Sequence, residues 1–229
     1  MSDNQSDLAA REVDEALRKE RMMALWKANG RYVYAAAILI VLIVAGRELY
    51  TSQVVEAQKA QSDIFNTAQR VAFDNPGDLQ APVVAWQTAL GELKGDYNSL
   101  AKLQLAASQS EAGDIEGAIA TYDALARQGS IEETVRDLAR LLAAILVADE
   151  LGDLEDGLSR LALVTGDDRP WKYSAKEQQG FILLALGQVE QARSVFEDLS
   201  FDTTTPAGIK QRATSMRDAL PTAPLVVED

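Results

Sequence analysis

The side chains that most often carry out chemistry are missing from this sequence. Its 229 residues include no His and no Cys. A thiolate nucleophile, a disulfide, an imidazole base and a zinc site built from Cys or His are therefore all excluded. The sequence also lacks the GxxxxGK[ST] and GxGxxG patterns of nucleotide-binding loops. We expect a protein that is not an enzyme, binds no cofactor and has no small-molecule substrate.

Ser and Lys occur without a His or Cys partner, and the most abundant side chains that could do chemistry are the 35 carboxylates of Asp and Glu. Residues 153–157 read DLEDG, and Asp167 is followed by Asp168. Neither cluster has the alternate spacing and the final Glu of an EF-hand loop. Neighbouring pairs such as Glu132 and Glu133 point to different faces of a helix. We interpret all of these acidic residues as solvated surface.

The charge of the chain is unevenly distributed. The formal net charge is −13, yet residues 1–50 contain seven basic and seven acidic residues, so the whole excess follows Tyr50. An acidic domain without a basic stripe is not expected to bind nucleic acid. The same charge argues against a domain that lies flat on anionic lipid.

One apolar segment divides the chain. Residues 32–46 carry no charge and consist mainly of Ala, Ile, Leu and Val. At about 1.5 Å per residue this run is about 22 Å long, and flanking Arg31 and Arg47 can extend it toward both membrane surfaces. Tyr residues near both ends suit the interfaces. The pattern predicts a single transmembrane helix over residues 31–50.

Two alternatives to a retained anchor remain open. The segment could be a cleaved signal peptide, although the part before it is about 30 residues long and contains acidic as well as basic residues. It could also be a buried helix of a soluble domain. Basic residues crowd the N-terminal flank, so the positive-inside rule places residues 1–30 in the cytoplasm. The large domain would then be periplasmic, and the protein a single-pass protein of a bacterial inner membrane.

Helical patterns dominate the rest of the chain. We expect residues 1–30 to form a mostly helical arm and residues 51–97 to form a helix pair with a turn at residues 75–78. We expect Gly95 and Asp96 to end the second helix of this pair. No segment alternates apolar and polar residues over the length of a strand, so the predicted fold class is all-α.

Three segments within residues 98–204 repeat one pattern. When Gly113, Gly152 and Gly187 are aligned, a small residue follows five positions later and a large apolar residue nine positions later. The small residues are Ala118, Gly157 and Ala192, and the large ones are Tyr122, Leu161 and Phe196. A Gly that ends a first helix in the left-handed conformation, followed by a closely packed second helix, makes an α-hairpin. The pattern predicts three degenerate tetratricopeptide-like hairpins, an α-solenoid.

The sequence also suggests where some helices begin and how the chain continues. Ser130 and Ser174 each precede a Glu by three residues, which predicts capping boxes for the first helices of the second and third hairpins. Thr205 and Pro206 resemble the cap and first residue of a capping helix over residues 205–220. Residues 221–229 form an acidic tail that we expect to be disordered.

The first helices of such hairpins line a concave surface. Counting back from the aligned glycines places five large apolar side chains there: Leu103, Leu142, Leu146, Phe181 and Leu184. As a hypothesis they line a groove for a segment of a partner protein. The other interpretation is that tight curvature of the array, or the helix over residues 53–73, already buries them.

The ordered combination of these features resembles one known family. The arm has the sequence ALWKANGRY, and one anchor, a helix pair and degenerate repeats follow. Trp171 precedes the third repeat, which continues as QQGFILLALGQVEQARSVFEDL. Together these features are similar to the ancillary subunit of the SecYEG translocon, in its alphaproteobacterial form. The degenerate second repeat and the longer acidic arm depart from the family pattern and leave the partner surface open.

The resemblance implies a function and partners. It implies a non-enzymatic accessory of the secretion channel, anchored in the inner membrane, with a periplasmic tetratricopeptide-like domain. The implied partners are SecYEG and a membrane-anchored chaperone of the peptidyl-prolyl isomerase type. An adaptor in envelope assembly or cell division would use the same scaffold and is the alternative. The sequence does not distinguish chaperone activity from passive scaffolding, or fix the oligomeric state.

Overall fold

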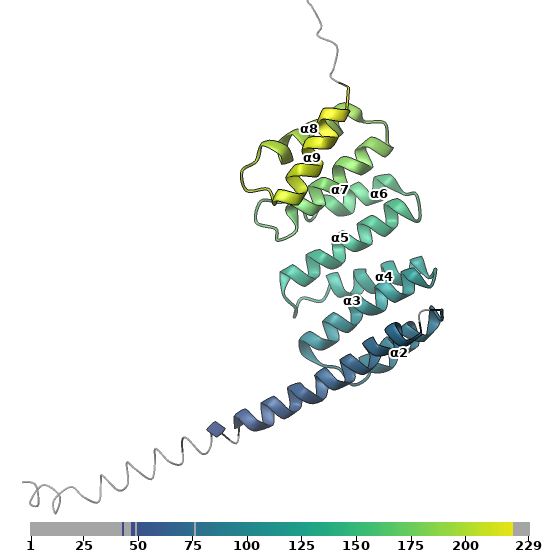
Figure 1. Ribbon diagram of the computed structural model, residues 1–229, viewed down its shortest axis with the longest axis vertical. Helices are drawn as coiled ribbons and strands as arrows, with labels where there is room; N and C mark the ends of the chain where they lie inside the picture. The colour runs from purple at the N-terminus through teal and green to yellow at the C-terminus, as the bar shows by residue number, and fades with distance from the viewer. Residues whose placement is uncertain (1–42, 44–46, 49, 76, 222–229) are drawn as a thin grey trace, which may run out of the picture. The chain divides into compact units, whose positions relative to one another are not determined.

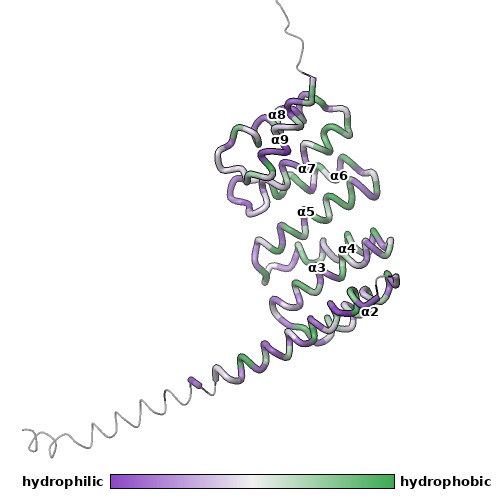
Figure 2. Tube along the Cα trace, viewed as in Figure 1, coloured by the Kyte–Doolittle hydropathy of each residue, from purple (hydrophilic) through white to green (hydrophobic). Residues whose placement is uncertain are grey.

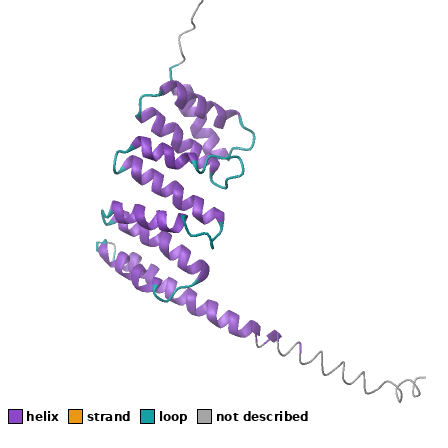
Figure 3. Cartoon of the chain, turned by 180° about the vertical axis from the view of Figure 1, so that it is seen from behind, coloured by secondary structure: helices purple, strands orange, loops and turns teal. Residues whose placement is uncertain are grey.

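The computed structural model describes residues 43, 47, 48, 50–75 and 77–221. The chain divides into two compact units, Met1–Lys59 and Ala60–Asp229. The described residues form helices joined by turns and loops, and none of them is in a strand (Figure 3). The all-α prediction is confirmed for this part of the chain.

In the part of the chain that the structure describes, residues 50–74 are helical and eight further helices follow. They are α2 (Gln80–Leu90), α3 (Gly95–Glu111), α4 (Ile115–Ala126), α5 (Glu133–Asp149), α6 (Leu154–Ala162), α7 (Lys172–Ala185), α8 (Val189–Phe201) and α9 (Ala207–Ala219). Within the second unit each helix from α2 to α9 packs on the next one, and α7 also touches α5 and α9 (Figure 1). This order gives three hairpins, α3–α4, α5–α6 and α7–α8, closed by α9.

The aligned glycines make the hairpin turns. Gly113, Gly152 and Gly187 have φ angles of 84°, 70° and 74°. A left-handed residue at this place reverses the chain at once, and only Gly adopts it without a steric cost. The next residue then donates back to the first helix, as Asp114 N–H does to the Gln109 carbonyl at 2.8 Å. The predicted turns are confirmed.

The other aligned positions build the cores between helices. Ala118 and Ala192 are fully buried, and Gly157 is buried as well. The large residues nine positions after each turn are also buried: Tyr122, Leu161 and Phe196. Apolar and polar positions alternate along each helix at the helical period, so one face is available for packing (Figure 2). Burial also raises the pKa of the Tyr122 phenol, with a further contribution from Glu111.

A separate core joins the first described helix to α2 and α3. Trp86 on α2 is 1% exposed, and its ring lies 4.9 Å from that of Phe65. Tyr97 on α3 contacts the same Phe65 ring. The turn before α2 forms through a 3.0 Å hydrogen bond from Asp78 N–H to the Asn75 carbonyl.

Several helix boundaries differ from the sequence prediction. The helix that contains Trp86 ends at Leu90, and Gly95 begins α3 instead of ending α2. The boundary between the helix pair and the first hairpin therefore lies before residue 95, and not at 97. The reason is a short turn at residues 91–94, held by Gln61, whose side-chain Oε1 accepts from Lys94 N–H at 2.7 Å. No local pattern signals this contact across 33 residues.

The two predicted capping boxes were wrong. The cap of α5 is Glu132, and Ser174 lies inside α7, whose cap is Trp171. Tertiary contacts explain the difference: Trp171 Nε1 donates to the Thr134 carbonyl at 2.9 Å, and Arg169 pairs with Glu133. These contacts between successive hairpins fix where both helices start. Trp171 thereby links neighbouring hairpins.

The last helix begins slightly later than predicted. Pro206 is the cap of α9 and Ala207 its first residue, so Thr205 is not the cap. The α9 helix ends at Ala219, and Arg193 on α8 donates to the Leu220 carbonyl at 2.8 Å. Residues 222–229, and with them the predicted disordered tail, lie outside the described residues.

The membrane prediction is not tested by the structure. Among the described residues no helix combines the length and hydropathy that a membrane crossing needs. Of the predicted anchor, residues 31–50, only four residues are described. The anchor and the arm of residues 1–30 therefore stay predictions from the sequence.

Candidate interaction surfaces

The five predicted groove residues belong to two different cores. Leu103, Leu142 and Leu146 are half-buried and pack where α3, α4 and α5 meet. Phe181 and Leu184 are half-buried against the core of α7, α8 and α9. None of the five is fully buried, and none is fully exposed.

These contacts leave the groove a prediction. The Phe181 ring meets the buried Phe196 ring at 5.4 Å, so part of its surface is already used in packing. Leu142 and Leu146 likewise contribute one side to a core. Each of the five side chains keeps part of its surface accessible. A partner would contact only these accessible parts, which together make a smaller surface than five fully exposed side chains.

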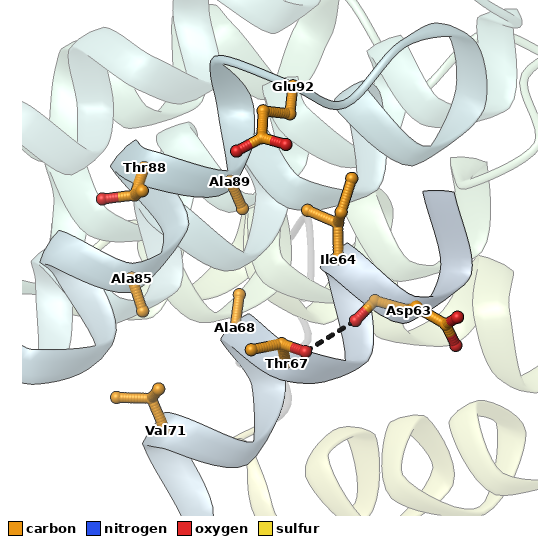
Figure 4. Close-up of a pocket in the computed structure, with 9 residues that line it drawn as sticks. All are labelled: Asp63, Ile64, Thr67, Ala68, Val71, Ala85, Thr88, Ala89 and Glu92. Carbon is orange, nitrogen blue, oxygen red and sulfur yellow. Dashed lines mark hydrogen bonds between the residues drawn. The ribbon is translucent and has the colours of Figure 1, made fainter. Parts of the chain in front are cut away.

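A different apolar pocket lies between the helix of residues 50–74 and α2. Its volume is about 480 Å³ (Figure 4). Ile64, Ala68 and Val71 line it from one helix, and Ala85 and Ala89 line it from α2. All of these lining residues belong to the second compact unit.

The polar rim of this pocket is acidic at one end. Asp63 and Glu92 are both exposed and lie at the end away from Val71 (Figure 4). Thr67 and Thr88 are also on the rim, but each hydroxyl donates to a carbonyl of its own helix, at 2.7 and 2.8 Å. An apolar side chain next to a basic one would therefore fit this pocket.

Sequence reasoning missed this pocket. The sequence pattern predicted a helix pair here and indicated no role for Ala68, Ala89 or Asp63. The signal that could have found it is the small side chains on facing positions, Ala68 against Ala85 and Ala89, which leave space between two helices. Their facing arrangement follows from the turn at residues 75–79.

Ion pairs join successive hairpins and hold these surfaces in place. Arg160 on α6 donates to Asp123 on α4 at 2.8 Å, and Arg212 on α9 forms two hydrogen bonds to Glu177 on α7, at 2.7 and 2.6 Å. The hydrogen bonds that Arg212 donates to the Glu177 carboxylate raise the pKa of Arg212. Such bidentate pairs set the distance and angle between elements.

The acidic clusters serve as helix caps and surface pairs. Asp153 Oδ1 accepts from Asp156 N–H at 3.0 Å, which caps α6. Asp167 is 95% exposed and lies 3.6 Å from Lys172. Among the described residues no group of three or more acidic side chains is arranged to hold a metal ion.

A family model decides how the array is classified. The model of the tetratricopeptide repeat-like domain matches residues 23–217. The match covers most of the chain. The chain belongs to this family.

Solved structures give the same fold. A Podosopora anserina protein with nearly identical TPR-like repeats, described as a kinesin light chain, has a TM-score of 0.53 at 13% identity. That match covers 68% of this chain and 82% of the other. A tetratricopeptide repeat protein from Parabacteroides merdae has a TM-score of 0.53 at 16% identity and covers 70% of this chain and 59% of the other. At these identities the likeness concerns the fold alone.

The comparison with curated proteins gave no significant match. Membership of the tetratricopeptide repeat-like family, with the stacked hairpins, indicates a protein–protein interaction scaffold of a fold that is typically non-catalytic. The family membership does not say which proteins it binds.

Proposed function

We propose that this protein is a membrane-anchored scaffold that binds proteins through its periplasmic repeat array, as an accessory of the Sec translocon. The observation that carries the proposal is the array itself: three α-hairpins and a closing helix, preceded by an apolar pocket in the helix pair. Bringing partners together requires surfaces, and the array offers them without reactive groups.

The anchor rests on the sequence. Residues 32–46 are uncharged, and basic residues gather before them. The family model starts at residue 23 and so includes this apolar segment together with the repeats. An anchor on the same chain would tether the array to the membrane.

The translocon assignment rests on the resemblance of the whole chain to the ancillary SecYEG subunit. Its partners would be the SecYEG channel and a membrane-anchored chaperone of the peptidyl-prolyl isomerase type. The pocket favours a partner segment with an apolar side chain beside a basic one, because its rim carries Asp63 and Glu92.

Site-specific photo-crosslinking in native membranes tests the proposal. Probes replace Thr88, which is exposed at the pocket, Leu142 and Phe181 in the predicted groove, and Leu17 in the arm. Exposed Gln191 on α8 is the matched control on a polar surface. We expect channel or chaperone subunits in the crosslinked bands at one or more of the first three positions and none at Gln191.

Two outcomes would overturn the translocon role. Crosslinks only to cell-division or cell-wall proteins would favour the envelope adaptor. Equal crosslinking at Gln191 and at the surface probes would mean that the contacts are not specific.

A further inference from the structure

A second cavity, separate from the pocket of Figure 4, collects arginines. It lies where the end of α4, the start of α5 and the end of α6 meet, and its volume is about 490 Å³. Arg127, Arg136, Arg140 and Arg160 line it, together with only two carboxylates, Asp123 and Asp156. We call it the arginine cleft. It is a local excess of positive charge on a chain whose formal net charge is −13.

Two of the four guanidinium groups are held in position. Arg160 donates to Asp156 at 2.7 Å and to Asp123 at 2.8 Å. The hydrogen bond to Asp156 contributes most to raising the pKa of Arg160. Arg140 donates to the buried Asp137 at 2.6 Å and to a backbone carbonyl at 3.3 Å. These arginines are oriented and partly neutralised.

The other two guanidinium groups are not satisfied by the protein. Arg127 has one distant contact, 4.0 Å from Asp123, and its side chain is 72% exposed. Arg136 makes no side-chain hydrogen bond or ion pair with any described residue, and its Nε is buried without a partner. A buried donor without an acceptor is unfavourable by the free energy of its lost hydration. An oxygen-bearing ligand in the cleft would supply the missing acceptor.

The residues that line the arginine cleft also indicate what kind of anion would fit. Leu163 is 61% exposed at the edge of the cleft, and Ala126 lies in it. A free phosphate would satisfy the arginines but leave this apolar surface in water. A peptide with a carboxylate beside an apolar side chain would use both parts. Guanidinium groups bind carboxylates through two parallel hydrogen bonds.

We propose that the arginine cleft binds an acidic segment of a partner protein, with carboxylates on Arg127 and Arg136 and an apolar side chain against Leu163. This inference rests on the scaffold function proposed above and names a ligand class for it. The cleft lies at the helix ends of the first two hairpins, and none of the residues that line it lines the pocket of Figure 4.

A peptide with the sequence of residues 221–229 is a suitable probe, because it is an acidic segment with neighbouring apolar residues. Its sequence, PTAPLVVED, places Leu and Val directly before Glu and Asp. A fluorescent peptide of this sequence is titrated against the purified full chain and against a variant that ends at residue 220, because the chain's own segment could compete. We expect saturable, salt-sensitive binding to at least one of them by fluorescence anisotropy.

Substitutions locate the binding. We expect the double variant Arg127→Gln, Arg136→Gln to weaken binding at least about tenfold, since charge-assisted hydrogen bonds to two side chains are lost. Arg70→Gln removes one positive charge from an exposed site outside the cleft and is expected to change the affinity less than about twofold. A peptide that ends in Gln and Asn in place of Glu and Asp is expected to bind as weakly as the acidic peptide binds the double variant.

Specific results would overturn the proposal. The proposal is wrong if the peptide binds saturably neither to the full chain nor to the variant that ends at residue 220. It is also wrong if Arg70→Gln lowers the peptide affinity as much as the double variant in the cleft does. Displacement of the peptide by inorganic phosphate at a similar concentration would indicate a small-anion site instead. Thermal unfolding of each variant shows whether the fold is retained. The crosslinking result above does not depend on the cleft, so either hypothesis can fail alone.

Discussion

Two glycines inside helices are placed where a side chain would collide with a neighbour. A Cβ on Gly180 in α7 would lie 2.6 Å from the ring of Phe196, which is fully buried. A Cβ on Gly157 in α6 would lie 2.9 Å from that of Ala148. Both glycines occupy aligned positions of the repeat, where the helices of a hairpin or of neighbouring hairpins approach closely. Their role is to leave space, and not to supply flexibility.

The Gly180→Ala substitution tests this role. Alanine favours a helix over glycine by up to about 1 kcal/mol, but forcing a methyl against a packed ring costs about 1–3 kcal/mol. We therefore expect a net decrease in the free energy of unfolding, measured by urea denaturation. Gly129→Ala is the control, since a Cβ there meets nothing within 4 Å. A Gly180→Ala variant as stable as the wild type would mean that the Phe196 ring moves freely.

At the scale of elements, Asp137 is a buried polar link between the second and third hairpins. Its side chain is fully buried on α5 and accepts from Arg140 at 2.6 Å. Arg169, in the loop before α7, approaches both of its oxygens at 3.4 Å. A buried carboxylate needs such partners because its charge has lost its hydration.

Asp137→Asn is expected to lower the free energy of unfolding by about 1–3 kcal/mol, because it removes the negative charge that pairs with Arg140 and Arg169 and replaces one acceptor oxygen by an NH2 donor. Asp167→Asn is the matched control: its partner Lys172 is 3.6 Å away and Asp167 is 95% exposed, so we expect a change below about 0.5 kcal/mol. Chemical denaturation measures both. Equal effects would contradict the assignment of Asp137 as the link.

The loop between α8 and α9 has a pH-sensitive contact. Asp202 accepts from the Thr204 hydroxyl at 2.6 Å, from Thr204 N–H at 2.7 Å and from the Tyr173 hydroxyl at 3.1 Å. The hydrogen bonds from Thr204 are the main reason why the pKa of Asp202 is lowered in the folded protein. Between the lowered pKa and the ordinary one, the folded chain binds fewer protons than the unfolded chain, so stability rises with pH there.

The stabilisation by Asp202 should therefore be complete above the ordinary aspartate pKa of 3.8 and be lost as the pH falls through the lowered value. We expect Asp202→Asn to melt at a lower temperature than the wild type at pH 7, with a difference that shrinks at pH 3 and below. Thermal unfolding monitored by circular dichroism across this range checks it. A difference independent of pH would exclude the charge of Asp202 as the cause.

At the scale of the whole molecule, the proposed function depends on joining an anchor to the array. The anchor is proposed from the run of residues 32–46, and the array from a family match that begins at residue 23.

A test of the anchor uses membrane extraction. We expect the full chain to stay in the membrane fraction at alkaline pH, and the variant Leu39→Arg, Leu42→Arg to be released. Each arginine in the middle of a span costs about 2.5–3.5 kcal/mol on insertion scales. Leu39→Val, Leu42→Val is the control and should stay in the membrane. Release of the wild-type chain, or a mature mass that lacks residues 1–46, would contradict a retained anchor.

The sequence alone determined the kind of fold. Helical periodicity and the three aligned glycines predicted the hairpins, because these signals are local: a left-handed Gly acts within a few residues, and burial at residues 118, 122 and their equivalents follows from the helical period. The absence of His and Cys bounded the chemistry in the same direct way.

Only the tertiary structure decided where helices start and which surfaces are open. Trp171 and Arg169 contact residues 37 and 36 positions earlier in the chain, and these contacts set the starts of α5 and α7 in place of the two predicted capping boxes. The predicted groove residues were divided between two cores, while Ala68 and Ala89 opened a pocket and Arg136 was left without an acceptor. These features depend on how far side chains on separate helices reach toward one another, and that distance is set by packing across the array rather than by any local pattern.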